Sequence, residues 1–160
     1  VHGGYMDSRC WDIHFLPHFS ALGHDCHALD LSGHGLSEGR GTPDEFGIDE
    51  FADDLRQLIA GLPDDAVLIG HSMGCAVIER VLERTATRAA ILMAPVPPTG
   101  TQGSIMRLAL KHPELFTEIA RISQGRLGPN SLSLMRDVYF SPVTEPEELL
   151  EFAHLIQPES

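Results

Sequence analysis

Residues Ala66–Ile78 read Ala-Val-Leu-Ile-Gly-His-Ser-Met-Gly-Cys-Ala-Val-Ile, and this stretch decides the fold. A short apolar run leads into a Gly-x-Ser-x-Gly turn, and apolar residues at helical spacing follow. This order indicates a strand, a sharp turn that lifts the serine hydroxyl above the sheet, and a helix. Gly70 and Gly74 are required because side chains there would collide with the neighbouring strand and helix. We therefore predict Ser72 at a strained backbone position, where helix amides and the positive dipole end face developing negative charge.

The composition is that of an ordinary globular chain with an acidic balance. The chain has 160 residues, 42% hydrophobic content and a net charge of −12. This length is sufficient for one domain with a core. No run approaches the roughly 20 apolar residues of a membrane span. We expect no nucleic-acid or anionic-membrane partner, because the negative charge would repel both.

Cysteine usage and motif spacing bear on location and cofactors. Cys10, Cys26 and Cys75 show no paired spacing, which is typical of a reducing compartment, and we predict a cytoplasmic location. No Cys/His cluster has metal-ligand spacing, and no Gly-x-Gly-x-x-Gly opens a helix after a strand, so neither metal nor cofactor is predicted. The pattern opens at Val1 in mid-strand, without a visible signal peptide, so we expect the natural chain to start upstream. The oligomeric state is not indicated.

Strand and helix patterns alternate through the first part of the chain. Strands are predicted at 27–31, 66–69 and 89–93, with Val1 at the end of a fourth. Helices are predicted at 11–22, at 48–59 and directly after Ser72. Pro17 either bends the first helix or marks its true start. The alternation predicts an α/β architecture, with a parallel sheet, right-handed crossovers and helices on both faces.

From Thr99 the pattern changes to short helices broken by Gly and Pro. We predict helices at 104–112, 113–121, 131–139 and 146–156, with no strand among them. Such helices cannot extend the sheet. We expect a helical lid with an apolar inner wall over the carboxyl ends of the strands, where ligands bind in sheets of this type. The alternative is a plain helical appendage. The predicted domains are a partial core, 1–98, and a cap or lid segment, 99–160.

Several polar residues and glycines have two interpretations. Gly3 and Gly4 permit positive φ and a close backbone approach to a ligand, or they form a flexible tail. His34 invites a catalytic role, but a loop residue that holds its turn by hydrogen bonds is the favoured interpretation, and Asp30 is likewise assigned a structural role. Surface or capping positions are expected for His14, His18 and His24. A solvated face rather than a metal site is expected for Asp44, Glu45, Asp53, Asp54, Asp64 and Asp65.

Three motifs, in the right order, resemble the α/β-hydrolase superfamily. His2-Gly3-Gly4 resembles its oxyanion loop, residues 30–37 (Asp-Leu-Ser-Gly-His-Gly-Leu-Ser) are similar to its D-x-x-G-H-G-x-S turn, and 70–74 resemble its nucleophile elbow. The similarity covers residues 1 to about 98, and 95–98 then look like the start of the family's cap. The fold it implies is an α/β-hydrolase core truncated at both ends, most similar to lysophospholipase-like or esterase-like members with a His-Gly-Gly loop.

The resemblance implies a mechanism. Ser72 would attack an acyl carbonyl, and the backbone N–H groups of Met73 and Gly4 would hold the oxyanion. The expected partner is a small-molecule carboxylic ester with an apolar part. In this family the acid and the general-base histidine follow the cap, and the chain ends at Ser160 before any such strand. We therefore expect the 160 residues alone to be inactive, and to be unstable because their sheet ends on unpaired edges.

Other activities on the same fold stay open at this point. A thioesterase, an amidase or a perhydrolase would use the same serine. Ser72 argues against dehalogenase or epoxide-hydrolase chemistry, for which family members place an aspartate there. A non-catalytic α/β-hydrolase-like binding or signalling protein is the hypothesis from a different class.

Overall fold

A computed structural model of the chain describes residues 1–63, 66–97 and 99–157. The chain divides into two compact units, Val1–Val96 and a second that starts at Pro97. The first unit carries the motifs found in the sequence. Asp64 and Asp65, which were expected on a solvated face, lie outside the described residues.

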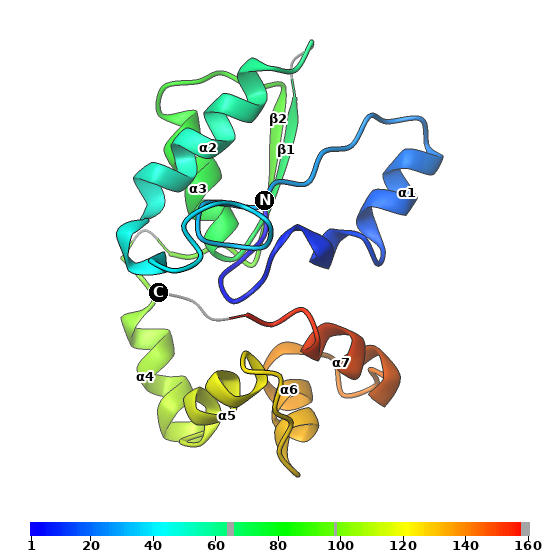
Figure 1. The fold of residues 1–160 in the computed structure, drawn as a ribbon, viewed down its shortest axis with the longest axis vertical. Coiled ribbons are helices and arrows are strands. Elements are labelled where there is room, and N and C mark those ends of the chain that lie inside the picture. Colours follow the sequence, from blue (N-terminus) through cyan, green and yellow to red (C-terminus); the bar gives the residue numbers. More distant parts are fainter. Residues whose placement is uncertain (64–65, 98, 158–160) are drawn as a thin grey trace. The chain divides into compact units, whose positions relative to one another are not determined.

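The sheet of the first unit is built on the strand that precedes Ser72. β1 (Val67–His71) and β2 (Ala89–Met93) are parallel neighbours, as predicted for these two segments (Figure 1). On the other side of β1, the Val1 nitrogen lies 2.6 Å from the Ile69 oxygen, and the His71 N–H donates to the Val1 oxygen at 3.2 Å. β1 is therefore flanked on both sides, by β2 and by the first residue of the chain.

The prediction of a strand at 27–31 is wrong. Within the described ranges the sheet has two strands, not the three or more that we expected, and 27–31 join no ladder. The Leu31 N–H donates to Nε2 of the His2 ring at 3.2 Å. A strand forms when backbone groups find backbone partners on a neighbour. Here a side chain takes that place, so the segment is not part of the sheet.

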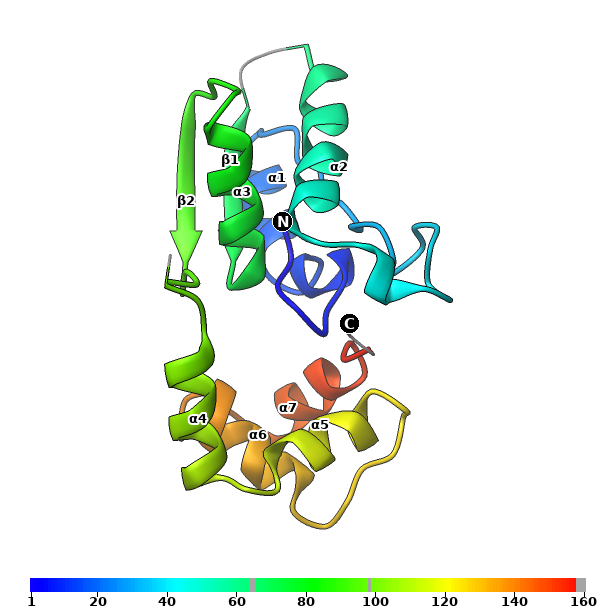
Figure 2. The same cartoon turned by 90° about the vertical axis from the view of Figure 1, so that its left-hand side faces the viewer.

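Helices lie on both sides of the strand pair. The helical elements of this unit are η1 (Ser8–Trp11), α1 (Phe15–Ala21), η2 (Pro43–Glu45), α2 (Ile48–Ala60) and α3 (Met73–Leu82). α2 and α3 cover one face of the strands, and α1 lies on the opposite side (Figures 1 and 2). The helix predicted at 11–22 is therefore two pieces. Pro17 lies in the first turn of α1, where its missing N–H is tolerated because those N–H groups have no intrahelical acceptor.

The main core of this unit lies where α2 and α3 pack on β1. Its buried members are Leu31, Phe51, Ala52, Leu55, Leu68, Val77, Ile78 and Val81. An exposed ion pair, Arg80 Nε to Asp49 Oδ1 at 2.5 Å, also joins α3 to α2. Because solvent screens such pairs, apolar burial supplies most of the stability. This packing fixes the start of α3 and with it the position of Ser72.

The second unit is helical in its described residues. Its helices are α4 (Gln102–Lys111), α5 (Leu115–Ile122), α6 (Ser131–Tyr139) and α7 (Pro146–Ala153), within a few residues of the predicted bounds. Two small apolar clusters hold them, with buried members Leu115, Ile119 and Leu134 in one and Ile122, Met135 and Ala153 in the other. Among all helices of the described ranges, none combines the length and apolarity needed to cross a bilayer.

Candidate active site

Ser72 stands at the junction of β1 and α3 with a strained backbone. Its φ of 52° and ψ of −116° fall in a region that residues with a side chain rarely adopt, at a cost of roughly 1–3 kcal/mol. Its N–H donates to the Met93 oxygen at 2.9 Å, which ties the turn to β2. Ser72 is the N-cap residue of α3, yet its side chain makes no capping hydrogen bond. The strain predicted for this position is present, and the hydroxyl does not serve as a helix cap.

The two glycines of the turn are required by close backbone packing. A Cβ on Gly70 would lie 2.7 Å from the Gly74 oxygen and 2.7 Å from Ile78 Cδ1. A Cβ on Gly74 would lie 2.5 Å from the carbonyl oxygens of both Val1 and His2. Both separations are far shorter than a van der Waals contact. The collisions that the sequence predicted for these positions are therefore confirmed.

The His2–Gly4 loop packs against Ser72. His2 and Gly3 are buried, so the loop is not a flexible tail. A Cβ on Gly3 would lie 3.1 Å from Ser72 Cβ, which shows how closely the loop approaches the serine. Positive φ is not found at the loop glycines and occurs instead at Tyr5, with φ of 62°. The structure thus places the first and third sequence motifs together.

The His2 ring joins this loop to the 30–37 turn. The side chain is fully buried, its Nε2 accepts the Leu31 N–H at 3.2 Å, and its Nδ1 lies 2.9 Å from the Gly3 oxygen. A ring nitrogen that accepts from an N–H carries no hydrogen, so Nδ1 carries the hydrogen and donates to Gly3. Burial lowers the pKa of His2 to about 4, which keeps this ring neutral near pH 7.

We expect this buried ring to make the fold acid-sensitive. Between about pH 6.5 and 4 the unfolded chain binds a proton on His2 that the folded chain does not, so the free energy of unfolding falls as the pH falls. The loss across this window is about 3 kcal/mol, and below it His2 adds no further pH dependence. Urea unfolding of the protein expressed from the complete gene measures the slope, and His2→Asn should reduce it by about one proton. Identical slopes in the two proteins would contradict this assignment.

Asp30 holds the 30–37 turn from inside. Its carboxylate accepts the Ser8 N–H at 2.7 Å and the Leu36 N–H at 2.8 Å. Partial burial raises the pKa of Asp30, but the hydrogen bonds from the two backbone N–H groups outweigh it, and the net pKa is lowered. A Cβ on Gly35, which has φ of 51°, would overlap this carboxylate. Asp30 therefore has the structural role predicted for it.

His34 also has a structural role. It is buried, its Nδ1 lies 3.0 Å from the Ser32 oxygen, and its ring centroid is 5.0 Å from that of His2 and 5.6 Å from that of Phe51.

Ser32 donates from its N–H and its hydroxyl to the Asp54 carboxylate, at 2.8 and 3.1 Å. Asp54 was expected on a solvated face, and this was wrong. Asp54 lies on the side of α2 that meets the 30–37 turn, and its partner Ser32 is 22 residues earlier in the chain.

The polar contacts of Asp7 and Cys75 were not anticipated from the sequence. Asp7 is buried, and its carboxylate accepts from Arg9 Nη2 at 2.6 Å and from the Arg9 N–H at 3.0 Å. The Cys75 thiol lies 3.2 Å from the Gly70 oxygen, behind the turn. Cys75 was marked only as an apolar position at helical spacing after Ser72, and the fold creates these polar contacts. The surface histidines are exposed as expected, at positions 14, 18 and 24, and the described residues hold no group of His, Cys, Asp and Glu placed for a metal.

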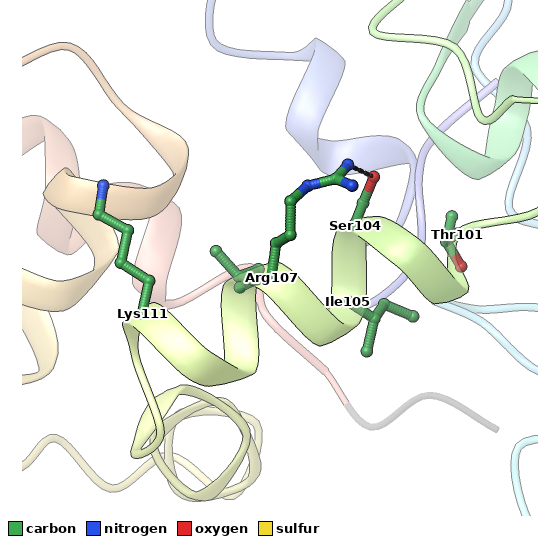
Figure 3. Close-up of a pocket in the computed structure, with 6 residues that line it drawn as sticks. Thr101, Ser104, Ile105, Arg107 and Lys111 are labelled. Carbon is green, nitrogen blue, oxygen red and sulfur yellow. Dashed lines mark hydrogen bonds between the residues drawn. The ribbon is translucent and has the colours of Figure 1, made fainter.

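A shallow hollow of about 400 Å³ lies along α4 in the second unit (Figure 3). It is lined by Thr101, Ser104, Ile105, Arg107, Leu108 and Lys111. Arg107 Nη2 donates to Ser104 Oγ at 3.1 Å. The same helix exposes 44% of Ile105, 64% of Met106 and 78% of Leu110. The hollow thus offers apolar contact area and positive charge, and its lining holds no histidine or carboxylate.

Comparison with known proteins gives curated relatives and structural neighbours. Methylesterase 3 of Arabidopsis thaliana is 31% identical over 93 residues, which are 57% of this chain and 35% of that protein. Methylesterase 2 of the same plant is 38% identical over 76 residues, which are 46% of this chain and 28% of that protein. The chain thus spans about a third of the length of the curated relatives that it matches.

Two solved structures show the same fold. Polyneuridine aldehyde esterase has a TM-score of 0.67 and 21% identity, covering 99% of this chain and 66% of that one. An extracellular alpha/beta-hydrolase from a Paenibacillus species has a TM-score of 0.66 and 19% identity, covering 99% and 64%. The model of the alpha/beta hydrolase family matches residues 1–158. With its strand, strained serine turn and helix, this chain belongs to the alpha/beta hydrolase family.

Proposed function

We propose that this chain carries the nucleophile of a serine hydrolase that acts on carboxylic esters. Ser72 Oγ would attack the acyl carbonyl, and the N–H groups of Met73 and Gly4 would receive the charge on the oxygen. The observation that supports this most is the positive φ of Ser72 at the start of α3, with Gly3 packed against it. Met73 is the first residue of α3, where an N–H has no intrahelical acceptor and can meet an oxyanion.

We propose that the general base and its acid lie outside these 160 residues. His2 uses both ring nitrogens in hydrogen bonds, so its ring is not arranged to take the proton of Ser72. His34 is buried in the 30–37 turn, where its Nδ1 lies 3.0 Å from the Ser32 oxygen, and we assign it to the turn. A serine hydroxyl without a base is a poor nucleophile at neutral pH. We therefore propose that the chain on its own is nearly inactive.

For the substrate we propose small esters whose acyl part is apolar. The names of the curated relatives, methylesterases 2 and 3, support a small alcohol such as methanol as the leaving group. We further propose that residues 99–160 are the cap. The apolar side chains that α4 exposes, Ile105, Met106 and Leu110, support an apolar wall on this segment.

Covalent labelling with a fluorophosphonate tests this proposal in the protein expressed from the complete gene. We expect labelling at Ser72, located by peptide mass spectrometry, because the phosphonyl adduct mimics the tetrahedral intermediate in the oxyanion site. Ser72→Ala should abolish labelling, whereas Ser20→Ala, at an exposed position of α1, should leave it unchanged. Folded wild-type protein that takes up no label would favour a non-catalytic binding protein instead.

A further inference from the structure

We propose that His2 is a positioning residue whose Nδ1–H sets the direction of the Gly4 N–H. The inference rests on the proposed function, in which that N–H is an oxyanion donor. The Gly3 C=O and the Gly4 N–H belong to one planar trans peptide unit and point in opposite directions. The hydrogen bond from His2 Nδ1 to the Gly3 oxygen, at 2.9 Å, therefore fixes the amide along with the carbonyl.

Gly3 and Gly4 have no side chains that could restrict the backbone of the His2–Gly4 loop. A Cβ on Gly3 would lie 3.0 Å from His71 Nδ1 and 3.1 Å from Ser72 Cβ, so a side chain here would crowd both residues. Two successive glycines leave the peptide between them with more backbone freedom than any other pair. A rotation of that peptide would turn the Gly4 N–H away and present the Gly3 carbonyl in its place. An oxyanion site needs a donor that is already oriented, so some other group has to prevent this rotation.

The His2 ring is itself held in a single state. The Leu31 N–H donates to Nε2 at 3.2 Å, which leaves Nδ1 as the nitrogen that carries the hydrogen. The side chain is fully buried, and its ring centroid lies 5.0 Å from that of His34. His34 belongs to the 30–37 turn, where its Nδ1 lies 3.0 Å from the Ser32 oxygen. The turn thus selects the tautomer of His2, and the tautomer selects the orientation of the Gly3–Gly4 peptide.

Three variants separate the two hydrogen bonds of the ring. In His2→Asn the amide NH₂ occupies the place of Nδ1 and keeps the donor to Gly3, while the acceptor for Leu31 is lost. In His2→Gln the amide reaches the place of Nε2 and keeps the acceptor, while the donor to Gly3 is lost. His2→Leu removes both. The variants are made in the protein expressed from the complete gene.

Ester hydrolysis is the first measurement. We expect kcat to fall about 10- to 100-fold in His2→Gln and His2→Leu with little change in KM, a fraction of what losing an oxyanion donor outright costs. His2→Asn should stay within about 5-fold of the wild type, because it keeps the bond that orients the donor. If kcat instead follows the melting temperature across the three variants, with Asn and Gln equally impaired, the positioning role is overturned.

The second measurement is independent of activity. Gly3-Gly4 is the one Gly-Gly pair of the 160 residues, so ¹³C-carbonyl and ¹⁵N glycine labelling gives it a carbonyl–amide NMR signal that Gly4→Ala identifies by its loss. This signal should move in His2→Gln and His2→Leu and stay in place in His2→Asn. An unmoved signal in His2→Leu would overturn the inference. A wild-type protein that hydrolyses no ester would defeat the proposed function instead, while this signal still decides whether His2 orients the peptide.

Discussion

Ser72→Ala is expected to lower kcat for ester hydrolysis by about 10⁴- to 10⁶-fold in the protein expressed from the complete gene. The residual rate would come from the oxyanion donors and from substrate binding, which the substitution leaves in place. KM should change little, because the hydroxyl acts in the transition state more than in the bound ground state. Steady-state kinetics with a chromogenic ester measure both values. A variant that kept a tenth of the wild-type kcat would exclude Ser72 as the nucleophile.

The stability of Ser72 variants separates chemistry from folding. The side chain makes no capping hydrogen bond, so Ser72→Ala should change the free energy of unfolding by less than about 0.5 kcal/mol. Ser72→Gly should be equally inactive but more stable by about 1 kcal/mol, because glycine adopts a φ of 52° without strain. Urea unfolding of the three proteins tests this. Loss of stability in Ser72→Gly would mean that the turn is not strained.

Gly74→Ala is expected to destabilise the fold by about 2–3 kcal/mol. The new Cβ would lie 2.5 Å from the carbonyl oxygens of Val1 and His2, and these are backbone atoms that cannot rotate out of the way. The better helix propensity of alanine, worth about 1 kcal/mol, offsets only part of this cost. Because the first residues would be pushed from their place beside Ser72, activity should fall as well. Thermal or urea unfolding and ester hydrolysis measure the two effects.

Gly41→Ala is the matched control for this substitution. Gly41 is exposed, and a Cβ there would meet no heavy atom within 4 Å. We expect a change in the free energy of unfolding within about 0.5 kcal/mol and unaltered activity. If Gly41→Ala and Gly74→Ala were equally stable, the close packing between α3 and the first residues would be wrong.

Local pattern was enough to find the elements near the site. The apolar run before Gly70 and the helical spacing after Ser72 gave β1 and α3, and the β-prone run at 89–93 gave β2. The strand expected at 27–31 shows where such reasoning stops. Its composition suits a strand, but a strand exists only where a neighbour supplies backbone partners, and here the His2 ring meets Leu31.

The polar residues of the site also differ in whether a local sequence pattern or a long-range contact determines their role. His34 was recognised as a turn residue, because glycines flank it, and Asp30 was assigned a structural role at the end of a predicted strand. Asp54 could not be recognised, since its partner Ser32 lies 22 residues away and is brought to it by the packing of α2. A long-range contact therefore overturned the expected solvated face for Asp54, whereas Asp44, Glu45 and Asp53 are exposed as expected.

By itself, the sequence determined that Ser72 would sit on a sharp turn between a strand and a helix. That follows from side-chain size at two glycines and from apolar spacing, which are local properties of 66–78. Only the tertiary structure decided that the His2–Gly4 loop lies against that serine, that the His2 ring carries its hydrogen on Nδ1, and that Asp54 braces the neighbouring turn. These contacts join residues 22 to 69 positions apart, and such pairs form only when the hydrophobic core brings distant segments together.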